Sequence, residues 1–187
     1  MRLFLAVPID RSRREALETW REAMTQDLVR GRPVNSDNFH ITMVFLGEVD
    51  QARLKAIVEA VQVALLDENP TDFVFTRIDA FTRGSEHLIY AAGDSVDARF
   101  KSIHASLYEA IKILGFTLDR RRFKPHITLL RRAITTSEPK RRMAPLRIPI
   151  DAIVLYESRR EHGHLRYIEL ERFLLVKPSP LRKKDLR

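Results

Sequence analysis

The residues with the clearest chemical potential are a histidine and a threonine that occur twice at the same spacing. The triplet His-Ile-Thr begins at His40 and again at His126, in a chain of 187 residues with 6 histidines. A histidine followed two places later by threonine should arise by chance about 0.3 times in such a chain. Imidazole exchanges protons near neutral pH, and the hydroxyls of Thr42 and Thr128 can donate hydrogen bonds beside it. Two such pairs in one cleft could act as general acid and general base.

Two histidines and two hydroxyls suit a substrate group with two non-bridging oxygens between an attacking and a leaving atom. A phosphodiester has this form, and hydroxyl and cationic donors stabilise the negative charge that spreads over its transition state. A neutral imidazole would take a proton from the attacking oxygen, while an imidazolium would give one to the departing oxygen. The sequence shows no carboxylate cluster of the kind that a two-metal phosphodiesterase needs, so we expect chemistry without metal or other cofactor.

Each triplet lies in a short apolar run with the period-two pattern of a β-strand. Residues 39, 41, 43 and 45 alternate with residues 40, 42, 44 and 46, so His40 and Thr42 are expected on one strand face. The second copy repeats this register after Pro125, which is tolerated at the first residue of a strand. The sequence therefore predicts two imidazole–hydroxyl pairs that are presented alike.

The elements that must position these strands are predicted from apolar spacing. We expect strands near 1–10, 39–46, 73–80, 87–92, 126–130, 148–157 and 165–176, and helices near 12–28, 50–68 and 97–114. Ser12 and Glu15 have capping-box spacing, and Asp50 and Asp97 are expected to cap the second and third helices. Trp20 lies on the apolar stripe of the first helix and is expected in the core. Residues 31–37, which follow Arg30 and include Arg32, and residues 135–145 are expected to be connections.

Composition narrows the class of protein. The chain contains no cysteine, which excludes disulfides and a thiol nucleophile and fits a cytoplasmic location. Pro8 and Asp10 end the first apolar run well before the length of a membrane span, so we expect no membrane partner. The net charge of +8 favours polyanionic partners. We expect one domain over residues 1–176, acting as a monomer, followed by a basic flexible tail at 177–187.

The two triplets lie in longer segments that resemble a known family. Residues 38–48 (NFHITMVFLGE) and 123–131 (FKPHITLLR) are similar to the signature segments of the 2H phosphoesterases. More closely, they resemble the RNA 2',3'-cyclic phosphodiesterases, also called 2'-5' RNA ligases. Residues 2–6 (RLFLA) and 155–158 (LYES) are similar as well, so the resemblance extends over most of residues 2–175.

The resemblance implies an α+β fold in a bilobal, pseudo-twofold arrangement. Two antiparallel sheets would have helices on the outside, and both triplets would lie on central strands that line one cleft. It implies hydrolysis of the 2',3'-cyclic phosphate end of an RNA or oligonucleotide to a 2'-phosphomonoester. By resemblance, His40 is the proton donor to the leaving O3' and His126 is the proton acceptor that activates water. Thr42, Thr128 and Arg131 would bind the phosphate.

Several alternatives stay open on the residues alone. The two triplets are locally near-identical, so the sequence does not assign acid and base, and either histidine could instead be structural. Phe4 shares a strand face with Arg2 and could stack on a substrate base or pack in the core. The same site could cleave or join 2'-5' linkages. The chain could also be a non-catalytic RNA-binding module, or a phosphodiesterase for small cyclic nucleotides.

The other histidines are weaker candidates. His104 lies on an apolar helix stripe and is expected to be buried, whereas His87 opens a strand at a turn and is expected to be exposed. His162 and His164 flank a hairpin glycine, and two ligands without a third make a poor metal site. The short hairpin at 81–87 departs from the form common in the family, which bears on how substrate nucleotides are held.

Overall fold

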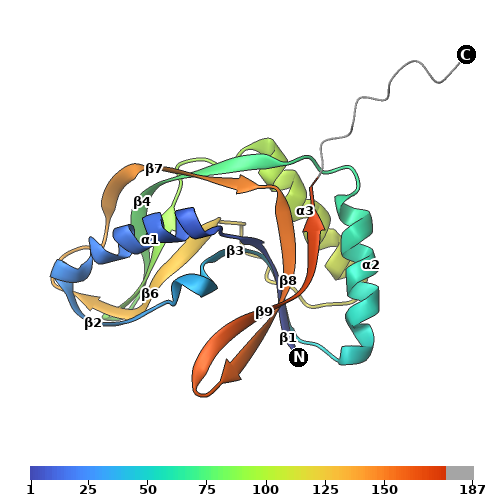
Figure 1. Cartoon of the computed structure of the whole chain (residues 1–187), viewed down its shortest axis with the longest axis horizontal. Helices are drawn as coiled ribbons and strands as arrows, with labels where there is room; N and C mark the ends of the chain where they lie inside the picture. Colours follow the sequence, from blue (N-terminus) through green and yellow to red (C-terminus); the bar gives the residue numbers. More distant parts are fainter. Residues whose placement is uncertain (176–187) are drawn as a thin grey trace, which may run out of the picture.

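The computed structural model describes residues 1–175, which form two antiparallel sheets and three α-helices (Figure 1). The strands are β1 (Arg2–Pro8), β2 (Leu28–Pro33), β3 (His40–Glu48), β4 (Thr71–Arg83), β5 (Glu86–Ala92), β6 (His126–Thr135), β7 (Arg141–Ile150), β8 (Ala152–Glu161) and β9 (His164–Leu174). The helices are α1 (Arg11–Glu22), α2 (Leu54–Leu65) and α3 (Ala98–Ile113). The α+β class with two antiparallel sheets is confirmed. The predicted tail at 177–187 lies outside the described residues.

The chain passes repeatedly between the two sheets. One sheet has the order β3-β1-β8-β9, and the other has the order β2-β6-β5-β4-β7. The first sheet therefore combines strands from both ends of the described chain, so the two sheets do not correspond to the two halves of the sequence. The strand β6 lies between β2 and β5, but β3 is at the edge of its sheet, so the expected central position is wrong for the first triplet.

The helix boundaries differ from the expected ones at the first helix. Asp10 caps α1, because its carboxylate accepts a hydrogen bond from the backbone N–H of Arg13 at 3.1 Å. Ser12 lies inside the helix, so the predicted capping box is wrong; aspartate is among the strongest N-caps and stands two residues earlier. The helix ends at Glu22, and Leu28 begins β2 instead of extending the helix.

The other two caps lie where they were expected. Asp97 caps α3 by accepting from the N–H of Phe100 at 2.7 Å. Asp50 caps a short 3-10 helix, Gln51–Arg53, that leads into α2. Gly115 follows α3 with φ of 83°, a conformation that suits glycine after a helix.

Two strands in regions expected to be connections are β2 and β7, the two edges of the five-stranded sheet. The strand β2 contains Gly31 and Pro33, and β7 contains Pro145 and Pro149. Proline lacks a backbone N–H and is tolerated at sheet edges, where the ladder needs fewer donors. The predicted strand at 148–157 is therefore the end of β7 and the start of β8, separated at Asp151.

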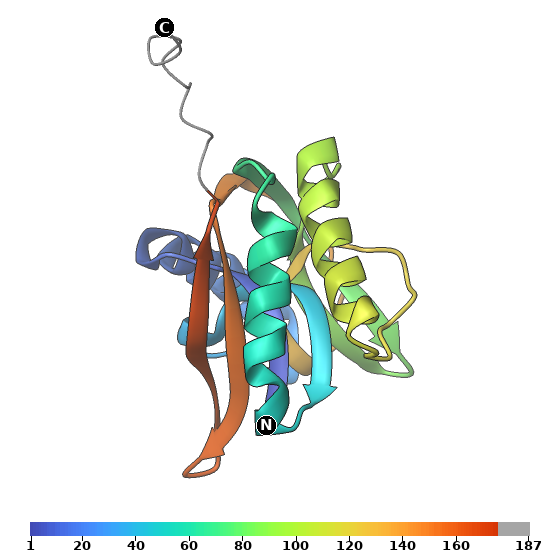
Figure 2. The same cartoon turned by 90° about the vertical axis from the view of Figure 1, so that its right-hand side faces the viewer.

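The helices cover the outer faces of the sheets. The helix α1 lies across β6 and β7, and α2 and α3 lie side by side (Figure 2). Trp20 is 5% exposed, which confirms its place in the core. None of the helices within residues 1–175 is long and apolar enough to span a membrane. The helices leave the inner faces of β3 and β6 to line the cleft described next.

Candidate active site

A cleft of about 860 Å³ contains both triplets. His40 and Thr42 line it from β3, and His126 and Thr128 line it from β6, which confirms that the two pairs face one cavity. Its lining includes four arginines and one carboxylate: Arg2, Arg121, Arg131, Arg160 and Glu48. This excess of positive charge favours an anionic ligand.

Each catalytic candidate histidine is oriented by the backbone two residues before it. Nδ1 of His40 lies 2.8 Å from the carbonyl oxygen of Asn38, and Nδ1 of His126 lies 2.8 Å from that of Lys124. A carbonyl only accepts, so the hydrogen-bond network places a proton on Nδ1 in both rings. Nε2 of each neutral imidazole is then the nitrogen that can accept a proton.

The His40 ring is enclosed by aromatic side chains. Phe4 and Tyr167 each lie 5.0 Å from it between ring centroids, and the Thr42 hydroxyl lies 2.9 Å from Nε2. Burial lowers the pKa of His40 to about 4, and the charges of Arg131 and His126 act in the same direction against the Asn38 hydrogen bond. His40 is therefore neutral at pH 7 in the free protein.

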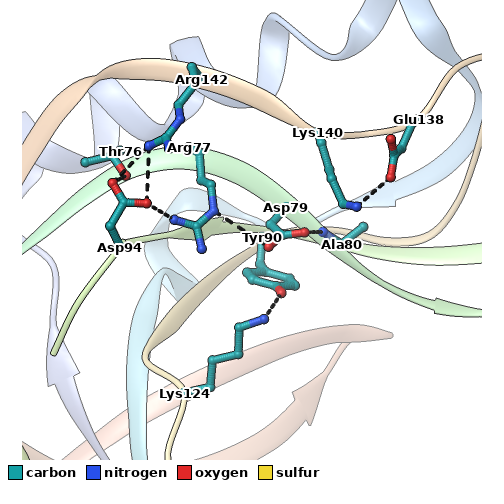
Figure 3. Close-up of polar contacts among 10 residues, drawn as sticks. All are labelled: Thr76, Arg77, Asp79, Ala80, Tyr90, Asp94, Lys124, Glu138, Lys140 and Arg142. Atoms are coloured by element: carbon teal, nitrogen blue, oxygen red, sulfur yellow. Dashed lines mark hydrogen bonds and ion pairs between the residues drawn. The ribbon is translucent and has the colours of Figure 1, made fainter.

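His126 has aromatic neighbours and a cation close to them. The rings of Phe81 and Tyr90 lie 5.6 and 5.3 Å from it. The Lys124 ammonium donates to the Tyr90 hydroxyl at 2.6 Å (Figure 3). It lies 4.8 and 5.0 Å from the ring centroids of Phe81 and Tyr90. Burial lowers the pKa of His126, and the charges of Lys124 and Arg131 lower it further, against the hydrogen bond to the Lys124 backbone.

A polar group on neighbouring strands supports the Tyr90 side of the cleft. Asp79 of β4 pairs in register with Tyr90 of β5, and the Arg77 side chain lies 3.7 Å from the Asp79 carboxylate (Figure 3). Arg77 and Arg142 also bind Asp94, which ties β4 to β7. These ion pairs therefore fix β4, which pairs with the Tyr90 strand β5 on the side opposite to β6 and His126.

Arg131 reaches the cleft because β6 contains a bulge. Thr128 and Leu130 pair with the adjacent residues Tyr90 and Ile89, so one extra residue lies between them. A bulge of this kind switches the side-chain alternation. Leu130 is 2% exposed, while Arg131 lines the cleft beside Thr128.

Phe4 lies at the cleft but offers little free surface. It is 3% exposed and packs against Tyr156, Tyr167 and His40. Of the two alternatives, this position favours packing over stacking on a substrate base, so Phe4 supports the orientation of His40.

Several lining residues were not identified from the sequence. Tyr167, Arg160, Arg2 and Arg121 come from other segments than the triplets. Arg2 had one signal, since it shares a strand face with Phe4. Arg121 also had one, since it belongs to the basic run at 120–124 that leads into the second triplet. No local pattern marked Arg160 or Tyr167 as lining residues, because only the pairing of β1 and β9 with β8 brings their segments to the cleft.

The remaining histidines lie apart from this pair. His104 is half-buried, less than expected, and stacks on Phe123 at 4.0 Å. His87 is also half-buried, and its Nδ1 lies 3.0 Å from the Thr82 hydroxyl. His162 and His164 are exposed at a hairpin tip. Within residues 1–175, no three histidine, cysteine or acidic side chains are grouped as metal ligands.

Comparison with known proteins agrees with this fold. Residues 8–162 match the model of the 2'-5' RNA ligase superfamily. A protein of Escherichia coli strain K12 named RNA 2',3'-cyclic phosphodiesterase is 30% identical over 178 residues, covering 94% of this chain and 97% of that protein. One of the same name from Archaeoglobus fulgidus is 33% identical over 130 residues, covering 69% and 71%. A third, from Geobacillus stearothermophilus, is 29% identical over 129 residues, which are 69% of this chain but only 41% of that protein.

Solved structures are similar over nearly the whole chain. The crystal structure of Escherichia coli LigT in apo form has a TM-score of 0.78 and 26% identity, covering 94% of this chain and 98% of that one. The same protein complexed with 3'-AMP has a TM-score of 0.77 and 28% identity, with the same coverage. Two antiparallel sheets around a cleft with paired His-x-Thr motifs define a 2H phosphoesterase. Within that class, the chain belongs to the 2'-5' RNA ligase superfamily.

Proposed function

We propose that the protein hydrolyses the 2',3'-cyclic phosphate ends of RNA or oligonucleotides to 2'-phosphomonoesters, with His40 and His126 as acid and base. The supporting observation is that two imidazoles, each fixed through Nδ1, line one arginine-rich cleft. The substrate class comes from relatives named RNA 2',3'-cyclic phosphodiesterase. One chain supplies both histidines, so we propose that it acts as a monomer.

The proposed reaction is an in-line displacement at phosphorus. Nε2 of His126 takes a proton from water as its oxygen attacks, the P–O3' bond breaks, and His40 gives a proton to O3'. The product carries the phosphate on O2' and a free 3'-hydroxyl. Thr42, Thr128 and Arg131 donate hydrogen bonds to the non-bridging oxygens, where negative charge increases in the transition state.

This direction of proton transfer requires help from the substrate. In the free protein the larger downward shift in pKa is that of His40, so the first proton bound is expected on His126. A phosphate anion in the cleft favours the imidazolium form of a neighbouring histidine. We therefore propose that the binding of substrate places the proton on His40.

The test is hydrolysis of a short RNA with a 2',3'-cyclic phosphate end in the presence of EDTA. The products are separated and identified by chromatography. His40→Ala and His126→Ala should each slow the reaction by a factor of about 100 to 10,000. Circular dichroism would establish that both variants are folded. Normal turnover in both variants would contradict the histidine pair, a 3'-phosphate product would contradict the geometry, and loss of activity in EDTA would contradict metal independence.

The profile of kcat/KM against pH provides a second check. It should be bell-shaped, because only the singly protonated pair is active. Since the pKa of each histidine is lowered in the free protein, we expect the maximum below pH 6.5. A flat profile from pH 5 to 9 would contradict acid–base catalysis by this pair.

A second activity of the same cleft is the joining or cleavage of 2'-5' linkages, for which the superfamily is named. The O5' hydroxyl of a second strand would replace water as the nucleophile and His126 would deprotonate it. Incubation of one cyclic-ended RNA with a 5'-hydroxyl acceptor, with both products measured, would separate ligation from hydrolysis. A protein that binds this RNA but forms neither product would be the non-catalytic binding module.

A further inference from the structure

A second pocket of about 420 Å³ adjoins the active-site cleft. The two cavities share Arg131, Leu165 and Tyr167 in their linings. One wall comes from the end of β2 and the segment after it, and the other from the tip of the β8–β9 hairpin. Its remaining lining consists of Arg32, Pro33, Val34, Asn35, Asn38, Glu161, His162, His164 and Arg166. Apart from Asn38, whose carbonyl orients His40, none of these residues is used by the proposed reaction.

Two arginines face each other across neighbouring strands at this pocket. Arg32 of β2 pairs in register with Arg131 of β6, and both are exposed. Like charges directly opposite each other destabilise a sheet. Within residues 1–175, neither guanidinium forms an ion pair with a carboxylate. An anion held between them would relieve this repulsion, which makes the Arg32–Arg131 pair a candidate anion site.

The hairpin wall adds one arginine, Arg166, and is anchored. Arg166 lies 3.9 Å from its only carboxylate partner within residues 1–175, Glu161, so its charge is only weakly compensated. The hairpin turns through His162 and Gly163, both with positive φ, which is the two-residue turn that fits twisted strands. The amide of Asn38 donates to the Leu165 carbonyl at 2.8 Å. The pocket is therefore formed before any ligand binds.

The position of Arg131 connects this pocket to the reacting phosphate. Its side chain borders both cavities, so an anion in the second pocket lies beside the cleft that holds the cyclic end. A nucleic acid strand carries one phosphate per nucleotide, and a mononucleotide with only a cyclic phosphate has no second one. We propose that this pocket binds the phosphate that precedes the terminal nucleotide and so selects oligonucleotides over mononucleotides. The inference rests on the proposed function.

The test compares kcat/KM for a short RNA with a 2',3'-cyclic phosphate end and for 2',3'-cyclic AMP. The wild-type protein should prefer the RNA. Arg32→Gln and Arg166→Gln should each lower the ratio of the two efficiencies by about 10-fold, because each removes a charge-assisted hydrogen bond to phosphate. The matched control is Arg30→Gln, since Arg30 lies two residues earlier in β2, pairs with Glu86 and does not line the pocket.

Salt dependence gives an independent readout. The slope of log kcat/KM for the RNA against log salt should become less steep by about 0.7 for each phosphate of the single strand that a variant no longer binds. The Arg30→Gln variant should keep the wild-type slope and ratio. No length preference in the wild type, or a ratio unchanged by both pocket variants, would overturn the second phosphate site. Hydrolysis of neither substrate by the wild type would instead overturn the proposed function.

Discussion

The strands β3 and β6 hold their histidines in the same way but surround them differently. His40 and His126 each have Nδ1 at 2.8 Å from the carbonyl oxygen two residues earlier. Phe4 and Tyr167 enclose the His40 ring. The two aromatic rings that contact His126 also contact the ammonium of Lys124. The backbone hydrogen bond is therefore the same for both histidines, but the side chains around the two rings differ.

The same contrast appears five residues after each histidine. Both strands have a bulge after the threonine, since the residues that flank Met43 or Leu129 pair with adjacent residues of the neighbouring strand. The bulge turns Phe45 into the cleft on β3 and Arg131 into it on β6. The two sides of the site therefore share a geometry, but only the second supplies a cation at this position.

The leaving-group dependence of the two alanine variants should separate their roles. The aryloxide leaving group of an aryl phosphodiester departs without needing a proton. His40→Ala should therefore lose much less activity on such a substrate than on the cyclic ribose phosphate. His126→Ala should lose a factor of about 100 to 10,000 on both substrates, because the attacking water still needs a base. Rescue of the His126 variant instead would mean that the two histidines have the opposite roles.

Arg131→Gln should lower kcat/KM by about 100-fold, because a donor to the developing phosphate charge is removed. It should also move the pH profile to higher pH. After burial, Arg131 is among the charges that lower the pKa of both His40 and His126. Phe45→Leu changes the equivalent position of β3 and should leave the pH profile in place. Equal pH shifts in the two variants would show that position, and not charge, controls the titration.

Features that depend on residues close together in the chain could be predicted from the sequence. Strand periodicity placed His40 and Thr42 on one face, and the cap at Asp97 and the turn between β4 and β5 depend on neighbouring residues. Strict alternation was wrong after Thr42, where Val44 is buried and Phe45 is exposed. An unbroken apolar run after each threonine, residues 43–46 and 129–130, was the only trace of the bulge.

The parts that could not be predicted depend on pairing between distant segments. Tyr167 reaches His40 because β9 pairs with β8 and β8 pairs with β1. Tyr90 reaches His126 because β5 pairs with β6. No local signal marks these partners. The edge strands β2 and β7 were not predicted, because their prolines and charged residues are typical of connections. The repeated triplet could therefore be found, but the difference between its two environments could not.

Unfolding at acid pH should distinguish the two histidines by stability. Burial holds the pKa of His40 at about 4, against about 6.5 when unfolded, so the unfolded chain binds the extra proton between these values. The contribution of His40 to folding stability should fall by roughly 2–3 kcal/mol as the pH drops from 6.5 to 4. In His40→Asn, urea titrations over this range should show a flatter dependence, and in His126→Asn a smaller flattening. An equal effect in both would contradict the difference in burial.

The smallest effect is expected at Lys124, and its sign depends on the role of His126. Lys124→Met keeps the packing on Phe81 and Tyr90 but removes a charge that, after burial, lowers the pKa of His126. If His126 is the base, kcat/KM should fall by about threefold near its maximum and stay unchanged on the alkaline side, because the active form there depends only on His40. If His126 is the acid, efficiency on the alkaline side should rise. Tyr90→Phe removes the hydroxyl partner and keeps the charge, so it should reproduce neither change.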